Sequence, residues 1–233
     1  MATLLLRLGA PLQSWGISSL YDTRGTDSYP TKSGVVGMLA AAMGRRRDEP
    51  VEDLAGLRFG IRIDAPGKLI HDYQVTDMGE KLNANISDRL YLSDALFLAG
   101  LSCEDENFLH EISDAVNHPV FPLFLGRRSC PVTLPLNLGI RDTGLYAALQ
   151  EEPWLVPEWR QKRLLQGRAQ TGLRIVMDAE EDHGAVRKDL PVSFSPFRRE
   201  YGYHYVADMP ARIVQNEGLA SVGEHDPMKE LGV

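Results

Sequence analysis

The order of apolar segments in the first half of the chain limits the folds that are open to it. Within residues 57–63, apolar side chains alternate with polar or small ones, as on a strand with one buried face. The apolar members are Leu57, Phe59, Ile61 and Ile63, and the others are Arg58, Gly60 and Arg62. Residues 3–9 are mostly apolar, like a buried strand, and residues 34–43 have the length and small side chains of a helix that Gly44 ends. The chain therefore begins strand, helix, strand.

The segments that follow extend this pattern. Residues 69–76 predict an extended segment, residues 90–101 a strongly apolar strand, and residues 105–117 a helix with one apolar face. This succession is typical of an α+β fold with the ferredoxin-like βαββαβ order. The excursion near residues 71–94 is too long for a tight hairpin turn, and long excursions in compact domains are usually functional or disordered.

A chain of 233 residues is long enough for one large domain or two small ones. We assign residues 1–140 to the βαββαβ domain, with the excursion inside it. Strand patterns at 171–177 and 199–206 predict a smaller β-rich extension over residues 141–214 that packs on this domain. Residues 215–233 are expected to form a polar, loosely held tail.

Composition indicates a folded protein of the reduced cytoplasm. Hydrophobic residues make up 43% and charged residues 24% of the chain, close to ordinary globular usage. No apolar run approaches the ~20 residues of a membrane span, and the start does not resemble a signal peptide. Cys103 and Cys130 lie far apart, without the spacing of a metal site or redox motif. We expect no membrane contact, no metal and no cofactor.

The net charge of −7 argues against a uniformly basic nucleic-acid-binding surface, but the charges are unevenly placed. Residues 1–47 and 158–174 are rich in arginine and lysine, and residues 115–141 contain three arginines and no acidic residue. A local basic face can bind phosphate whatever the total charge. The alternative is an ordinary mixed surface, and the acidic run at 178–182 is expected to be a solvated loop.

Four motifs carry chemistry, and the first is the segment Arg7-Leu-Gly-Ala-Pro-Leu-Gln-Ser-Trp-Gly at residues 7–16. A strand runs into a loop broken by glycine and proline, which displays Gln13, Ser14 and Trp15. Glycine permits close approach of a ligand to the backbone, and tryptophan can stack on a base. The alternative is a turn beside a core tryptophan.

The second motif lies at the expected helix start, where Thr31, Lys32, Ser33 and Gly34 follow Pro30. Free amides and the helix dipole attract an anion at such a position, and a lysine adds a full charge. Ordinary helix capping explains the same residues equally well. Because the GxxxxGK[ST] pattern is absent, a P-loop nucleotide-binding site is not indicated.

The third motif, at residues 125–131, places Arg127 and Arg128 after a glycine in the stretch without acidic residues. Arginine binds two phosphate oxygens at once, which suits this position to an anion. Cys130 lies in the same motif, but no histidine or acid is near it in sequence. We therefore interpret it as a packed cysteine rather than a nucleophile.

The fourth motif is His71-Asp-Tyr-Gln-Val-Thr at the start of the excursion. His71 could act as a general base, although a lone histidine at a strand edge is more often structural. The other histidines are scattered, without metal-ligand spacing.

Together these motifs resemble the Cas-five family of the RAMP superfamily, in the form found in type I-E CRISPR Cascade complexes. The matching segments are RLGAPLQSWG at 7–16, TRGT with YPTKSGVVGMLAAAMG within 23–44, HDYQV at 71–75, RLYLSDALF at 89–97 and FLGRRSCP at 124–131. Residues 190–201, LPVSFSPFRREY, are similar but looser. The resemblance implies a modified RRM or ferredoxin-like domain with a protruding β-hairpin thumb.

The resemblance also implies a function: a non-catalytic subunit that caps the 5′ handle of the CRISPR RNA. Its expected partners are this RNA, the backbone subunit CasC and the large subunit that reads the PAM, with target DNA contacted only through the complex. The RNA-binding residues carried over from the motifs are Gln13, Ser14, Trp15, Arg24, Thr31, Lys32, Ser33, Gly34, His71, Tyr73, Gln74, Arg127, Arg128 and Ser129. Lys32, Arg127 and Arg128 are expected to hold phosphates together with the amides at 32–35.

Two other functions remain open from the sequence. One is a metal-independent endoribonuclease acting on precursor CRISPR RNA, with His71 or Tyr73 as the base, as in the cutting branch of the same family. No arrangement in this sequence matches that branch. The other is a scaffold that binds only protein, which predicts no salt-dependent affinity for RNA.

Overall fold

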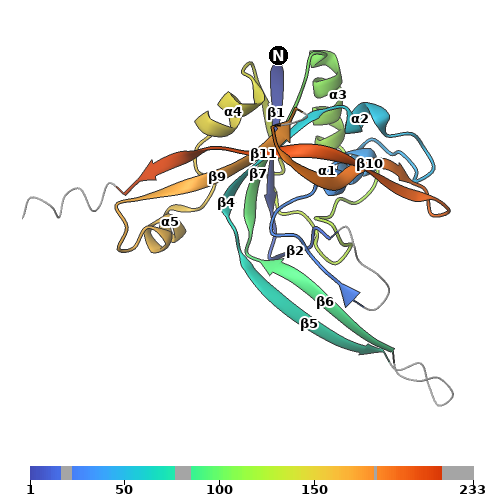
Figure 1. Ribbon diagram of the computed structural model, residues 1–233, viewed down its shortest axis with the longest axis horizontal. Coiled ribbons are helices and arrows are strands. Elements are labelled where there is room, and N and C mark those ends of the chain that lie inside the picture. Colours follow the sequence, from blue (N-terminus) through green and yellow to red (C-terminus); the bar gives the residue numbers. More distant parts are fainter. Residues whose placement is uncertain (17–22, 77–84, 181–182, 217–233) are drawn as a thin grey trace, which may run out of the picture.

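The computed structural model describes residues 1–16, 23–76, 85–180 and 183–216, and shows an α+β fold with a long protruding hairpin (Figure 1). The strands are β1 (Ala2–Gly9), β2 (Leu12–Gln13), β3 (Thr23–Arg24), β4 (Arg58–Ala65), β5 (Lys68–Thr76), β6 (Asn85–Ser93), β7 (Leu96–Cys103), β8 (Asn137–Arg141), β9 (Gln170–Ala179), β10 (Ala185–Phe194) and β11 (Arg199–Gln215). The helices are α1 (Lys32–Ala42), α2 (Glu52–Ala55), α3 (Glu106–Asn117), α4 (Leu145–Glu151) and α5 (Glu158–Leu164).

The main sheet has seven strands in the order β10-β11-β9-β4-β7-β1-β8, and its neighbouring strands are antiparallel. Its β4-β7-β1-β8 half is the predicted unit, because the chain visits it as β1, α1, β4, β7, α3 and β8. This arrangement confirms the α+β fold with ferredoxin-like order.

The two faces of β1 show how the sequence divides the core. Leu4, Leu6 and Leu8 pack with the cluster that contains residues of α1 and α3, whereas Leu5 packs with α4 on the opposite face. On the α4 face, Gly60 and Gly100 are register partners in β4 and β7. A Cβ at Gly100 would lie 2.5 Å from Leu145 Cδ1, so this glycine permits the close approach of α4.

A buried ion pair fixes the end of α4 to the sheet. Arg62 is fully buried in β4, and its Nε donates to Asp64 Oδ1 over 2.6 Å. The same guanidinium donates to the carbonyl oxygens of Leu149, Glu152 and Pro153 at the C-terminal end of α4. The positive charge of Arg62 therefore interacts with the partial negative charge at the C-terminal end of α4. This contact attaches the segment after α4 to the core.

The expected excursion is a long antiparallel hairpin formed by β5 and β6, which we call the thumb (Figure 1). The strand expected over 90–101 is divided in two near residue 94, where the excursion was expected to end. Asp94 has a φ of +54° and separates the thumb strand β6 from the sheet strand β7. The polar residues Ser93 and Asp94 interrupt the apolar run at this corner. Residues 77–89 are polar and carry weak structure signals in the sequence, yet residues 85–89 belong to β6. Residues 77–84 lie outside the described residues.

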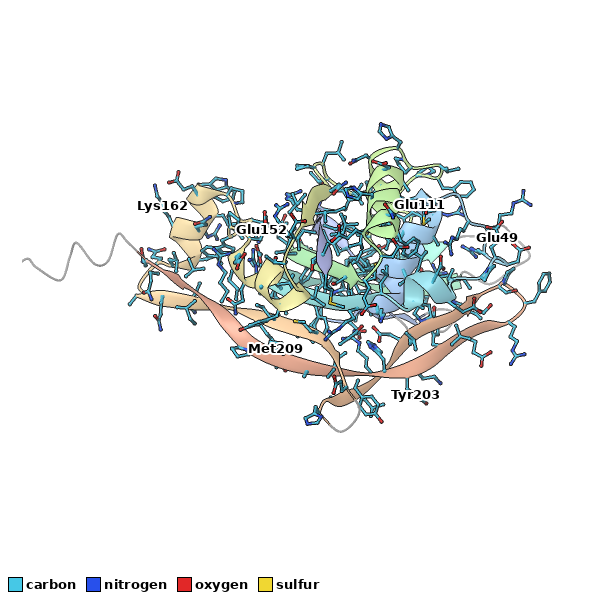
Figure 2. All side chains as sticks on the ribbon, turned by 90° about the horizontal axis from the view of Figure 1, so that it is seen from above. Glu49, Glu111, Glu152, Lys162, Tyr203 and Met209 are labelled. Carbon is cyan, nitrogen blue, oxygen red and sulfur yellow. The ribbon has the colours of Figure 1, made fainter. Side chains whose placement is uncertain are left out.

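The strands of the C-terminal extension continue the main sheet, because β9 pairs with β4. The long strand β11 pairs with β9 over residues 205–215 and with β10 over residues 199–206, so β9 and β10 lie along its opposite edges. Figure 2 shows this ribbon on the side of the sheet away from α3, with Tyr203 and Met209 along it. In the predicted tail, residues 217–233 lie outside the described residues.

The expectation that the acidic run at 178–182 is a solvated loop is wrong for its first residue. Asp178 belongs to β9, and its side chain is only 16% exposed. Residues 181–182 lie outside the described residues. Within the described ranges, no helix is both long enough and apolar enough to cross a membrane.

Candidate functional site

A cavity of about 360 Å³ lies where several distant chain segments meet. We call it the arginine cavity. Its lining residues are Ser14, Trp15, Gly16, Arg24, Gly25, Thr31, Ser33, Gly34, Gly126, Arg127, Arg199 and Tyr201. They come from the loop after β1, the strand β3, the start of α1, the loop at 125–130 and the start of β11. The first, second and third sequence motifs therefore meet at one place.

Two glycines make this convergence possible. Gly126 has a φ of +85°, and a Cβ there would lie 1.6 Å from the carbonyl oxygen of Ser14. Only glycine fits that conformation and that contact. At the start of α1, a Cβ on Gly34 would lie 2.9 Å from Trp15 Cε3. The missing side chains let the loop at 125–130 approach the Ser14 carbonyl and let the helix approach the Trp15 ring.

The start of α1 is capped by protein groups instead of being open to a ligand. Thr31 is the N-cap residue, and its Oγ1 accepts from the Gly34 amide over 3.1 Å. The Lys32 amide donates to Asp189 Oδ2 over 2.9 Å, and the Val35 amide donates to the Thr31 carbonyl. The expected set of free amides at 32–35 is therefore largely occupied.

The side chain of Lys32 is also committed to the protein. It is buried, and its Nζ forms a 2.7 Å ion pair with Asp178 of β9. Lys32 does not line the arginine cavity. This position argues against the expectation that Lys32 holds a phosphate, because a carboxylate from a distant strand neutralises its charge.

Asp178 and Asp189 belong to a larger buried network around His204 of β11. The His204 Nδ1 lies 3.0 Å from Asp178 Oδ1, and its Nε2 contacts Asp189 Oδ1. Burial by itself would lower the pKa of His204, but hydrogen bonds to the two carboxylates outweigh burial and raise this pKa to about 9. For Asp178, burial alone would raise the pKa, because it disfavours the charged carboxylate. Interactions with His204 and Lys32 outweigh burial and lower this pKa. The network thus links β9, β10 and β11 to the start of α1.

Gln13 and Trp15 serve the fold. Gln13 is fully buried, and its Nε2 donates to the carbonyl oxygens of Leu8 and Ala95. Its Oε1 accepts from Trp15 Nε1 over 3.0 Å. Trp15 is 1% exposed and belongs to the core cluster, although it forms part of the cavity wall. These positions favour the alternative that Trp15 supports the loop, and they leave Gln13 no free polar group for reading a base.

Arg127 is held at the rim by several contacts. Its Nη2 donates to the carbonyl oxygens of Arg24 and Gly25, at 2.7 Å and 3.2 Å, and its guanidinium lies over the Tyr91 ring. Its Nη1 is shielded from solvent and has no hydrogen-bond partner within the described part of the chain. Such an unpaired donor beside a cavity is unusual, and a phosphate oxygen would satisfy it.

Arg128 and Ser129 occupy the outer side of the same loop. Both are exposed, and neither lines the arginine cavity. The hydroxyl of Ser129 lies 3.5 Å from that of Tyr91 in β6. This contact joins the loop to the base of the thumb. Arg128 is therefore placed to meet a ligand only outside the cavity.

The residues of the fourth motif lie on the thumb, outside the lining of the cavity. His71 Nε2 is 2.5 Å from Asp88 Oδ1, and the His71 side chain is 61% exposed. Gln74 donates to Asp72 Oδ2 over 2.8 Å, and Tyr73 is exposed. The structure thus separates the candidate thumb residues from those of the other three motifs.

Two lining residues, Arg199 and Tyr201, were not among the sequence candidates. They lie at the start of β11, and Arg199 stacks on Tyr201 with 5.3 Å from guanidinium carbon to ring centre. Their segment belongs to the looser match at residues 190–201, so a signal was present. It was too weak to single out these two residues.

The lining groups define what the cavity can hold. The described residues that line it include three arginines, two hydroxyl residues near the helix start and no carboxylate. This chemistry suits an anion with several oxygens, such as a phosphate. Within the described residues, no group of three or more histidine, cysteine or acidic side chains is arranged to hold a metal ion.

Comparison with known proteins agrees with the motifs. The sequence profile of a family described as CRISPR-associated protein (Cas_Cas5) matches residues 3–207, most of the chain. The protein belongs to the Cas5 family. The resemblance inferred from the motifs is confirmed.

Among relatives of this Cas5 protein, the CRISPR system Cascade subunit CasD of Escherichia coli (strain K12) is 35% identical over 159 residues. That match covers 58% of the chain and 70% of the relative. A solved structure described as a CRISPR RNA-guided surveillance complex contains a chain with a TM-score of 0.72 and 29% identity, with 90% of each chain covered. A Cas protein crystal structure gives a TM-score of 0.67 and 39% identity, covering 90% of this chain and 94% of that one.

Proposed function

We propose that this Cas5 protein is a non-catalytic subunit of a cytoplasmic, Cascade-type CRISPR surveillance complex and binds the 5′ handle of the CRISPR RNA in the arginine cavity. The observation that carries the proposal is the lining of this cavity, in which three arginines from three segments meet without a carboxylate. A backbone phosphate of single-stranded RNA matches these donors in charge and geometry. The relative named as a Cascade subunit supports the assignment to such a complex.

The candidate ligands follow from the geometry. Arg24, Arg127 and Arg199 supply positive charge, and Ser33 lies at the helix start beside them. The hydrogen-bonding capacity of Arg127 is not filled by the described residues, because its Nη1 has no partner among them. Tyr201 offers a ring edge or face next to the phosphate site, and Ser14 and Gly34 shape the wall. Sequence preference for the handle then depends on backbone groups and Tyr201, because Gln13 is committed to the fold.

An endoribonuclease remains the second candidate, and one contact gives it a specific form. His71 pairs with Asp88 on the thumb, an arrangement in which a carboxylate orients an imidazole. Both side chains are on an open hairpin, and His71 is mostly exposed, so neither a phosphate-binding pocket nor a shielded environment surrounds the pair. Specific cleavage of repeat RNA by the purified chain that is lost in His71→Ala would establish this alternative.

The thumb is our proposed contact with the backbone subunit CasC and the large PAM-reading subunit, with target DNA reached only through the complex. Several apolar side chains on it are exposed: Leu69, Ile70, Tyr73, Val75 and Ile86. Apolar side chains gathered on a protruding hairpin are typical of a surface that a partner covers.

The test compares RNA retention in complexes assembled by co-expression with the partner subunits and CRISPR RNA. Replacing a phosphate-binding arginine by glutamate removes an attraction and adds a repulsion, so we expect Arg127→Glu and Arg24→Glu each to weaken RNA binding about 100-fold or more. The salt dependence of RNA affinity should also become shallower.

Lys162→Glu is the matched control, because Lys162 is an exposed cation on α5 (Figure 2) and does not line the cavity. It should retain RNA. Circular dichroism and gel filtration establish that each variant is folded. Wild-type RNA affinity and salt dependence in both folded arginine variants would refute phosphate binding in the arginine cavity.

A further inference from the structure

The tip of the β10–β11 hairpin carries an aromatic side chain that the fold does not use. Phe197 is 98% exposed, and the side chain of Arg198 beside it is 83% exposed. Burying a phenylalanine side chain is worth about 1.5–3 kcal/mol, so a fully exposed one contributes almost nothing to folding. The tip lies at the opposite end of the ribbon from α5 (Figure 1).

The turn that presents Phe197 is held by short-range hydrogen bonds. The Ser195 amide donates to Ser193 Oγ over 3.2 Å, and the Phe197 amide donates to Ser195 Oγ over 3.3 Å. Just before this turn, Phe194 packs toward α1: a Cβ on Gly37 would lie 3.4 Å from Phe194 Cζ. Phe194 thus connects the tip of the hairpin to α1, the helix whose start borders the arginine cavity.

The same hairpin runs from the tip directly into the cavity. Arg199, two residues after Phe197, lines the cavity together with Tyr201. Two residues of extended chain cover about 7 Å, so the exposed ring lies close to the rim. A strand whose phosphate is held in the cavity therefore has its neighbouring base within reach of Phe197.

We propose that Phe197 is a base-stacking site for the RNA strand whose phosphate occupies the arginine cavity. This inference rests on the function proposed above and extends its site to the hairpin tip. Aromatic rings bind bases of single-stranded nucleic acid by their faces, next to cations that follow the backbone. Arg199, which lines the cavity, provides such a cation two residues from the ring, and Lys188 of β10 lies 5.4 Å from the Tyr203 ring further along the hairpin.

A partner protein is the other class of occupant that an exposed phenylalanine can have. The surroundings favour RNA because the ring is continuous with a cavity lined by arginines and without a carboxylate among its described lining residues. Near the tip, Glu200 is paired with Arg198 at 3.1 Å, so its negative charge is offset.

The experiment uses the full chain, purified with its partner subunits, and a set of synthetic single-stranded CRISPR repeat RNAs. Each RNA carries 4-thiouridine at one position, and crosslinks are mapped by mass spectrometry. We expect one nucleotide to crosslink to Phe197. Phe197→Ala should lose this crosslink and weaken RNA binding about 10-fold, whereas Phe197→Trp should retain both. Trp159→Ala, which removes an exposed ring from α5, is the matched control and should bind RNA normally.

The outcomes separate this inference from the proposed function. Wild-type RNA affinity and crosslinks in Phe197→Ala, together with weakened binding in Arg127→Glu, would overturn stacking at the tip and leave the cavity intact. Loss of a protein subunit from Phe197→Ala with unchanged RNA affinity would assign the ring to a protein interface and also overturn it. Absence of any RNA affinity in the wild-type complex would defeat both proposals.

Discussion

At the scale of the residue, contacts between individual atoms determine the position of the residues that line the arginine cavity. The Ser14 carbonyl oxygen occupies the place where any side chain on Gly126 would have to go. Arg127, the next residue, then reaches the carbonyl oxygens of Arg24 and Gly25 and spans the cavity rim. The position of the basic group therefore depends on a neighbouring residue that has no side chain.

Gly126→Ala tests this dependence. The added Cβ meets a backbone oxygen in a left-handed conformation, so we expect a loss of stability on the order of 2 kcal/mol and displacement of the loop at 125–130. Thermal unfolding measures the first effect, and RNA affinity of the assembled complex measures the second. Gly25→Ala is the stability control, because a Cβ there would meet no atom of the described residues within 4 Å beyond its chain neighbours, and its φ is not positive. Equal stability of the two variants would contradict the proposed role of Gly126.

His204 gives a prediction about pH. Its pKa in the folded protein is about 9, compared with 6.5 for an unperturbed histidine, because Asp178 and Asp189 stabilise the charged ring. Its contribution to stability is therefore complete below pH 6.5 and is lost as the pH rises toward 9. Unfolding in urea should show stability falling over this range in the wild type.

The matched variant for this prediction is His204→Gln, which removes the titrating group. It should be less stable than the wild type at pH 6 and should show a flatter stability profile between pH 6.5 and 9. NMR titration of the His204 ring gives an independent value. A ring pKa near 6.5 would show that the two carboxylates do not stabilise the protonated ring.

At the scale of the element, buried charges attach the pieces of the fold to one another. Lys32 joins α1 to β9 through Asp178, and Arg62 joins β4 to the end of α4. Each charge is paired and hydrogen-bonded, which is the condition under which a buried charge is tolerated. These pairs determine the angle and depth of the helices more closely than apolar contact alone, because their geometry is directional.

Arg62→Met should therefore be costly. It leaves the carboxylate of Asp64 buried without its partner and removes the donors to the end of α4, so we expect a loss of about 3–5 kcal/mol. Arg58→Met in the same strand is the control, since Arg58 is exposed, and its effect should stay below about 0.5 kcal/mol. Chemical denaturation measures both variants. Similar small losses in the two would show that the Arg62–Asp64 pair contributes little.

At the scale of the whole molecule, the protein is a rigid sheet with two projections. The thumb extends from the ends of the central strands β4 and β7, and the long β10–β11 hairpin extends beside α1 (Figure 1). The arginine cavity lies between the base of the thumb and the start of β11. This arrangement places an anion site at the root of both projections, as expected for a subunit that holds an RNA end while contacting other chains.

A double variant tests the thumb as a protein contact. Val75 and Ile86 are register partners and are 59% and 46% exposed. Lysine at both positions should leave the isolated fold intact and reduce co-purified partner subunits about 10-fold or more, because it places two charges in an apolar interface. Ile213→Lys on β11, where the side chain is 51% exposed, is the control. Full recovery of the partners with the double variant would exclude this face of the thumb as their contact.

The sequence by itself determined the order of the elements and the segments that form the site. Alternation in β4, the mostly apolar character of β1 and the helical face of α3 are local patterns that depend on nearest neighbours along the chain. The residues in three motifs were correctly gathered as one region because they match a family whose members share this fold. The excursion near residues 71–94 was also visible as a local pattern, and its expected end agrees with the break at Asp94.

Only the tertiary structure decided which groups of these motifs face the arginine cavity. Lys32 turns inward because Asp178 arrives beside it from a strand 146 positions away. Trp15 and Gln13 are covered by the core, while Arg199 and Tyr201 reach the cavity from the far end of the sequence. A pattern of neighbouring residues contains no information about such distant partners, and for a charged or polar side chain the partner determines the direction in which it points.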